Sequence, residues 1–171
     1  MEELTWNHLK EVLEQFGAYF VERAKQNLLQ DGSNASGNLT NSIVFHVDVT
    51  ETHYEVTVEL EDYWYYVENG RKSGKFPPLD KIKEWIEIKP VLPHVMTLKN
   101  GKTVLPTVDQ LAYLIGRKIA NEGTQGTGFF SEAKEDAIKR FELAIEYAIR
   151  EDLDEYIGKL VEELPEDLLL V

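Results

Sequence analysis

The 171-residue sequence contains no cysteine. Disulfide scaffolds, thiolate metal sites and cysteine nucleophiles are therefore excluded. Long apolar runs are also missing, because no stretch approaches the roughly 18 to 20 residues that a membrane-spanning helix needs. The opening Met1-Glu2-Glu3 is unlike the start of a signal peptide. We expect a protein that is made and used in a cytoplasm, or in an assembly formed there.

Positive charge is scarce. The chain carries 18 Lys and Arg against 31 Asp and Glu, which gives a formal net charge of −13. Residues 131–171 hold 13 of the acids and only 5 of the bases. Affinity for phosphate backbones depends on Lys and Arg displacing counterions, so this composition argues strongly against a nucleic-acid reader. It is compatible with a surface that nucleic acid slides past without binding.

Recognisable catalytic patterns are missing as well. No HExxH or i,i+4 histidine pair suggests zinc, and no GxSxG elbow suggests a serine nucleophile. The glycines of residues 123–128 lack the GKS or GKT of a phosphate loop. The acid pairs Glu61-Asp62 and Glu151-Asp152 are interpreted as solvated charge. The histidines are interpreted as surface or loop residues: His8, His46, His53 and His94.

Apolar spacing predicts a long helix at each end of the chain. The first covers residues 5–30 and stops at Gly32. The second covers residues 131–163, where residues 150–152 permit a break. Between them, residues 43–49 and 54–60 alternate apolar and polar side chains and form an antiparallel hairpin. We predict an α+β fold, with a small antiparallel sheet of three or four strands packed against the long N-terminal helix and several C-terminal helices.

Shorter elements are predicted from local signals. Pro77-Pro78 opens a helix over residues 79–88, and Asn100-Gly101 marks a projecting hairpin near residues 91–105. Thr107 begins a capping box and a helix that ends at Gly123.

The length favours one domain. Within it, residues 1–130 form the α+β core, and residues 131–171 form an acidic helix with an apolar tail, either in the same domain or as a peripheral arm.

Four consecutive aromatic residues, Tyr63 to Tyr66, form the most unusual stretch, which continues as Val-Glu-Asn-Gly-Arg71. Their side chains point around most of a turn, so one core cannot absorb all four. They fit a short helix with amphipathic rings at its edges, or a surface that meets another chain. The glycine-rich residues 123–128 are predicted to be a flexible joint that delivers Phe129 and Phe130 to a surface.

Several pieces in fixed order carry a resemblance. They are Ala35-Ser-Gly-Asn-Leu-Thr-Asn-Ser-Ile43 before the hairpin, Tyr63-Trp-Tyr-Tyr-Val-Glu-Asn-Gly-Arg71 after it, Pro77-Pro78, and Gly123-Thr124 with Phe129-Phe130 and Ala133. This set, which spans roughly residues 30 to 135, resembles the tail-completion, or head–tail joining, proteins of tailed bacteriophages. The longer hairpin at 89–106 and the acidic C-terminal helix depart from the family pattern.

The resemblance implies a non-enzymatic structural protein of the virion neck or tail, without cofactor or metal. Copies would assemble in the host bacterial cytoplasm into a six-fold or twelve-fold ring that contacts the portal or connector and the tail-tube or tail-hub proteins. Genomic DNA would pass through without specific binding, and no membrane is involved. Arg71, Lys72 and Lys75 would pair with the acidic helix of a neighbour. The predicted interface residues are Tyr63, Trp64, Tyr65, Tyr66, Glu68, Arg71, Lys75, Phe129 and Phe130.

Two other interpretations stay open. The chain fits a soluble monomeric protein-binding module whose aromatic segment grips a peptide. It fits less well a metal-dependent nuclease using Asp80, Glu87 and Lys89. Within a helix, Glu87 and Lys89 would point about 200° apart, whereas hydrolytic metal sites need convergent carboxylates.

Overall fold

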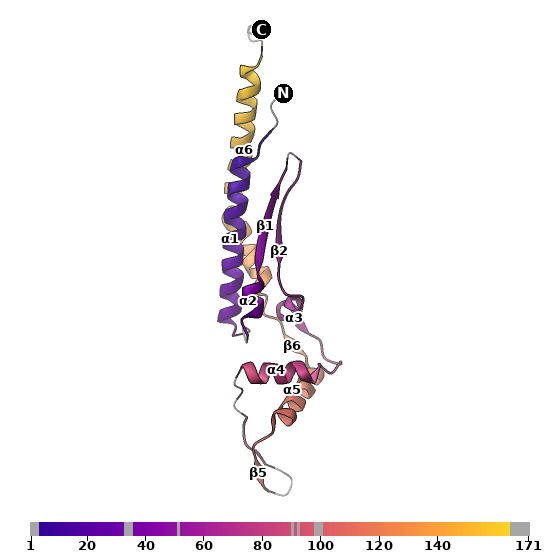
Figure 1. Ribbon diagram of the computed structural model, residues 1–171. Helices are drawn as coiled ribbons and strands as arrows, with labels where there is room; N and C mark the ends of the chain where they lie inside the picture. The colour runs from indigo at the N-terminus through magenta and orange to yellow at the C-terminus, as the bar shows by residue number, and fades with distance from the viewer. Residues whose placement is uncertain are drawn as a thin grey trace. The chain divides into compact units, whose positions relative to one another are not determined.

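The structure is a computed structural model that describes residues 4–32, 36–50, 52–89, 91, 93–97 and 101–164 (Figure 1). Its elements form two compact units, each built from separate stretches of the chain. Unit 1 takes its described residues from 4–27, 43–60 and 130–164, and unit 2 takes them from 28–42 and 61–129. The elements are α1 (Asn7–Gln30), α2 (Asn38–Ser42), β1 (Val44–Val49), β2 (Tyr54–Glu59), α3 (Trp64–Asn69), β3 (Gly70–Arg71), α4 (Leu79–Ile88), β4 (Met96–Thr97), β5 (Thr103–Val104), α5 (Val108–Glu122), β6 (Thr124–Gln125) and α6 (Phe129–Glu162).

In unit 1, two long antiparallel helices pack beside a hairpin, and Figure 1 shows α1 and α6 side by side with β1 and β2 along them. The strands pair antiparallel, from Val44 opposite Glu59 to Val49 opposite Tyr54. Because side chains alternate along a strand, one face of the hairpin meets the helices and the other meets solvent. The buried residues Leu9, Leu13 and Ala148 form a core cluster, against which the half-buried side chains of Val47, Val49 and Val56 pack.

Close contact between α1 and β1 depends on Gly17. This helical residue is buried, and a Cβ atom added there would overlap the ring of Phe45 on β1. The helix gives up about 1 kcal/mol of propensity by placing glycine in its interior. The absence of a side chain at Gly17 lets the ring of Phe45 lie directly against the backbone of α1.

In unit 2, α4 and α5 pack through the buried residues Ile82, Ile86 and Ala112. The predicted starts of both helices are confirmed. Pro78 is the N-cap of α4, and Thr107 forms a complete capping box with Gln110 at α5. Nζ of Lys83 lies 2.7 Å from Oδ1 of Asp109 in the first turn of α5, which joins the two helices at their surface.

The glycine-rich segment 123–128, predicted to be a flexible joint, contains the two-residue strand β6. β6 pairs antiparallel with β3, with Gly70 opposite Gln125 and Arg71 opposite Thr124. Gly70 has a φ of +72°, and a Cβ atom there would overlap the carbonyl oxygen of Thr124. Glycine is needed at this position for both reasons, because L side chains rarely adopt such a φ.

Several other predictions can now be judged. The α+β class is confirmed, but the expected three- or four-stranded sheet is wrong, because the strands of the described residues form three two-stranded pairs. The 91–105 hairpin is confirmed as the antiparallel β4–β5 pair, while its Leu92, Leu98, Lys99 and Asn100 lie outside the described residues. The α2 helix was not predicted, and α6 continues without a break through residues 150–152. Among the helices of the described residues, none is long and apolar enough to cross a bilayer.

Candidate functional site

The predicted aromatic segment forms the helix α3 and leaves three tyrosine rings exposed. Tyr63, Tyr65 and Tyr66 are 42%, 57% and 61% exposed. Their neighbour Trp64 is half-buried, and its ring centroid lies 6.2 Å from that of Tyr65. Since tyrosine rings on a surface combine apolar area with a polar tip, this segment suits contact with another molecule.

Tyr66 lines an apolar pocket in unit 2. The pocket has a volume of about 630 Å³. We call it the Trp85 pocket, after the half-exposed ring on α4. Its described lining consists of Tyr66, Arg71, Pro77, Pro78, Lys81, Ile82, Trp85, Ile115, Ile119 and Thr124. A pocket of this size, with apolar walls and a few polar groups, is typical of a binding site.

A second pocket of about 320 Å³ adjoins the first, since Tyr66 and Trp85 line both. Lys89, Gly32, Val67, Gln125 and Thr127 complete its described lining. We call the two adjoining pockets together the aromatic recess. Its polar character comes from Lys89, Gln125 and Thr127, whereas the Trp85 pocket is mostly apolar.

Three cations and no carboxylate line the aromatic recess in the described part of the chain. A guanidinium nitrogen of Arg71 donates to the carbonyl oxygen of Lys75 at 3.0 Å, and Nζ of Lys89 donates to that of Gly32 at 2.7 Å. Nζ of Lys81 lies 2.9 Å from Oε2 of Glu84. Among the described residues, Arg71 and Lys89 form no ion pair, so both keep charge available in a chain of net charge −13.

Two predicted interface residues are buried. Phe129 is 0% exposed, so the prediction that the glycine-rich segment delivers both phenylalanines to a surface is wrong for this ring. Phe130 is half-buried, with its ring centroid 4.9 Å from that of Phe20. Glu68 is 8% exposed, and its carbonyl oxygen accepts a hydrogen bond from the N–H of Gly128. Lys75 is exposed beside Arg71.

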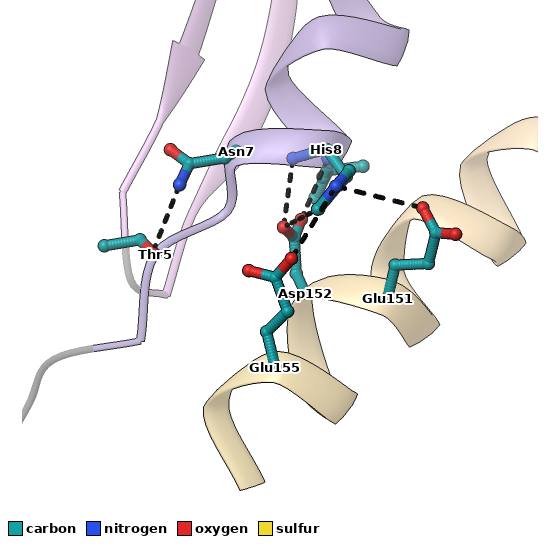
Figure 2. Close-up of polar contacts among 7 residues, drawn as sticks. Thr5, Asn7, His8, Glu151, Asp152 and Glu155 are labelled. Carbon is teal, nitrogen blue, oxygen red and sulfur yellow. Dashed lines mark hydrogen bonds and ion pairs between the residues drawn. The ribbon is translucent and has the colours of Figure 1, made fainter. Parts of the chain in front are cut away.

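A separate polar cluster in unit 1 lies at the start of α1 (Figure 2). The oxygens of Asp152 accept hydrogen bonds at 2.9 Å from the backbone N–H groups of His8 and Leu9 and from the His8 ring. Helices usually obtain such an acceptor from the residue just before their first turn, but Trp6 has no side-chain oxygen to supply. Asp152 on α6 therefore caps a helix that lies 144 residues away in sequence.

The interpretation of Glu151-Asp152 as solvated charge is wrong for Asp152, which is 2% exposed. Burial acts to raise the pKa of Asp152, but the hydrogen bonds from Leu9 and His8 outweigh burial and lower it. The hydrogen bond to Asp152 raises the pKa of His8 against a smaller effect of desolvation, with help from Glu155 and Glu151. The cluster therefore favours the charged forms of both groups, with a protonated His8 imidazole next to an ionised Asp152 carboxylate.

We expect the contribution of His8 to stability to depend on pH. Because its folded-state pKa is raised, the stabilisation is fully present below about pH 6.5 and is lost as the pH rises through the folded-state value. Asp152 has a lowered pKa, so its own contribution is lost only as the pH falls below about 3.8 and through that lowered value. Urea unfolding of the native chain and of His8→Gln should therefore differ more at pH 5.5 than at pH 8.5. The other three histidines are common to both proteins, and an equal difference at the two pH values would contradict the assignment.

The residues suggested for a nuclease do not converge. Asp80 lies in the first turn of α4, Glu87 lies in its last turn, and Lys89 follows the helix and bonds to Gly32. Within the described residues, no three His, Asp or Glu side chains form a group that could hold a metal ion.

Sequence reasoning placed Tyr66 and Arg71 at the site but missed Trp85, Lys81 and the two isoleucines of α5. In α4, Ile82 and Ile86 are buried, whereas Trp85 is 38% exposed. Lys81 and Trp85, four residues apart, lie on one side of a helix. This spacing shows that the two residues share a helix face, but it does not show that this face lines a pocket. Nor does it show that the Trp85 ring stays partly exposed beside α5.

Comparison of the chain with protein-family models, with curated proteins and with solved structures finds no match.

Proposed function

We propose that this chain is a non-enzymatic structural protein of a tailed bacteriophage, and that copies of it form a ring in the neck that joins the head connector to the tail. The proposal combines the resemblance of residues 30–135 to head–tail joining proteins with the exposed aromatic surface of unit 2. The single observation that carries it is the aromatic recess, where exposed Tyr66 and Trp85 adjoin three cations and no carboxylate in the described lining.

The chemistry of the recess suits attachment to protein. Aromatic and arginine side chains dominate the energetics of protein interfaces, and they act most strongly where a partner desolvates them. A ring requires heterologous contacts, in which one patch meets a different patch on the next copy. An apolar recess with a cationic edge is one half of such a contact.

The charge of the chain suits a DNA passage. A net charge of −13 repels phosphate, so DNA would move through the ring without being held. The excess of 13 acids over 5 bases in residues 131–171 makes the last helix the strongest candidate for the surface nearest the DNA. This assignment places the protein in the virion, after assembly in the bacterial cytoplasm.

A monomeric protein-binding module is the second candidate, because the aromatic recess is complete within one copy. The two functions differ in the mass of the protein in solution. A ring protein should form oligomers alone or with the connector, whereas a binding module should stay one copy per ligand.

The deciding experiment is to produce phage particles without this protein. Filled heads and complete tails should then accumulate separately, and adding the purified protein should join them. Electron microscopy and plaque counts measure both results. Particles that are joined and infectious without it would exclude the proposal.

A further inference from the structure

We propose that the aromatic recess of one copy binds residues 164–171 of a second copy, Leu-Pro-Glu-Asp-Leu-Leu-Leu-Val. This inference rests on the proposed function, because it names the two patches that would meet in the ring. It concerns unit 2 of one chain and a segment that follows α6 of another.

Charge selects the segment. In its described lining the recess holds Arg71, Lys81 and Lys89 and no carboxylate. Residues 164–171 hold Glu166 and Asp167 and no base. Since Arg71 uses one guanidinium nitrogen on the Lys75 carbonyl, its remaining N–H groups can take a carboxylate in a charge-assisted pair.

Shape and polarity agree with this choice. The segment has five leucine and valine side chains, and the Trp85 pocket is lined by the apolar side chains of Ile82, Ile115 and Ile119 and by the rings of Trp85 and Tyr66. Eight extended residues reach about 26 Å, which lets leucines enter the Trp85 pocket while acids lie near the cations. Such an arrangement of apolar anchors with a charged edge is typical of protein interfaces.

The helix that leads to the segment is also uncovered. Ten residues of α6 follow Asp152, and their apolar side chains recur at steps of three and four. The exposed members of this stripe, with Leu164 beyond the helix, are Leu153, Ile157, Val161 and Leu164. Residues 164–171 follow the stripe directly in sequence and are rich in leucine, so one partner surface would cover both the stripe and the segment.

Because the chain has no cysteine, single introduced cysteines provide a clean test. A tagged Lys81→Cys variant is mixed with an untagged Leu169→Cys variant and oxidised in the assembled state, either at a concentration where the mass exceeds one copy or in particles. A disulfide-linked pair should form in at least about tenfold greater yield than with the control, since docking raises the local thiol concentration. The control is Glu87→Cys, an exposed position on α4 that does not line the recess.

The outcomes separate this inference from the proposed function. Assembly that persists with no Lys81→Cys to Leu169→Cys link, or with equal linking of the control, overturns the inference and leaves the ring intact. A double variant that links within one chain overturns the choice of a second copy. A protein that stays single in every mixture, with particles joined in its absence, overturns both.

Discussion

The Asp152→Ala variant is expected to unfold with a free energy about 3 kcal/mol lower than that of the native chain. The substitution leaves two backbone N–H groups at the start of α1 without their acceptor, at a site where water has little access. It also removes the partner of the His8 ring. Urea unfolding followed by circular dichroism measures the change through the midpoint at constant slope.

Two further variants test whether the loss of stability comes from the hydrogen bonds that Asp152 accepts. Asp154→Ala alters an exposed acid on the same helix, so it should change the free energy of unfolding by no more than about 0.5 kcal/mol. Asp152→Asn keeps one carbonyl oxygen as an acceptor, so it should fall between the two alanine variants. Equal midpoints for Asp152→Ala and Asp154→Ala would show that the cap contributes nothing to stability.

Removing the aromatic edge of the recess should have the largest effect on assembly. Truncation of a buried aromatic anchor costs roughly 2–4 kcal/mol, so Tyr66→Ala and Trp85→Ala should each weaken self-association or connector binding by about thirtyfold or more. The exposed fractions of 61% for Tyr66 and 38% for Trp85 leave part of each side chain free to contact a partner. Sedimentation or light scattering over a dilution series measures the association.

Tyr147→Ala is the matched control, because its ring is 64% exposed on α6 and does not line the recess. It should assemble as the native chain does. Thermal unfolding must show that the recess variants remain folded. If folded Tyr66→Ala and Trp85→Ala protein assembled at native concentrations, the recess would not be the interface.

The success of sequence reasoning depended on how local each signal was. The starts of α4 and α5 were predicted because Pro77-Pro78 and Thr107 act within one turn of the helix they begin. The β1–β2 hairpin was predicted because alternation and a short link suffice. Each of these elements can be recognised without knowledge of its tertiary neighbours.

Features that join distant residues were missed. The partner of Asp152 lies 144 residues away, and nothing near Asp152 in sequence distinguishes it from the exposed Asp154. The glycines at 123–128 suggested a flexible joint, but Thr124 and Gln125 pair with Arg71 and Gly70, which lie far away in the sequence. The burial of Phe129 was missed for the same reason, because a glycine-rich approach does not reveal where the following ring lies.

The residues of the proposed site also differ in whether a local sequence signal identifies them. Tyr66 and Arg71 stand out as an aromatic run and a basic cluster, and both line the Trp85 pocket. Trp85, Ile115 and Ile119 have spacings that fit an ordinary buried face. Only the packing of α4 on α5 shows that part of this face stays open.

The interleaving of the two units has a consequence for synthesis on the ribosome. Unit 2 is complete once residue 129 has been made, whereas unit 1 still waits for most of α6. At about 5 to 20 residues per second, the nascent α1 therefore spends seconds with its first turn uncapped and its apolar stripe uncovered until Asp152 and Ala148 emerge. Because α6 is made after α1 and completes its packing, a translation product that stops before α6 would expose the face that α6 normally covers.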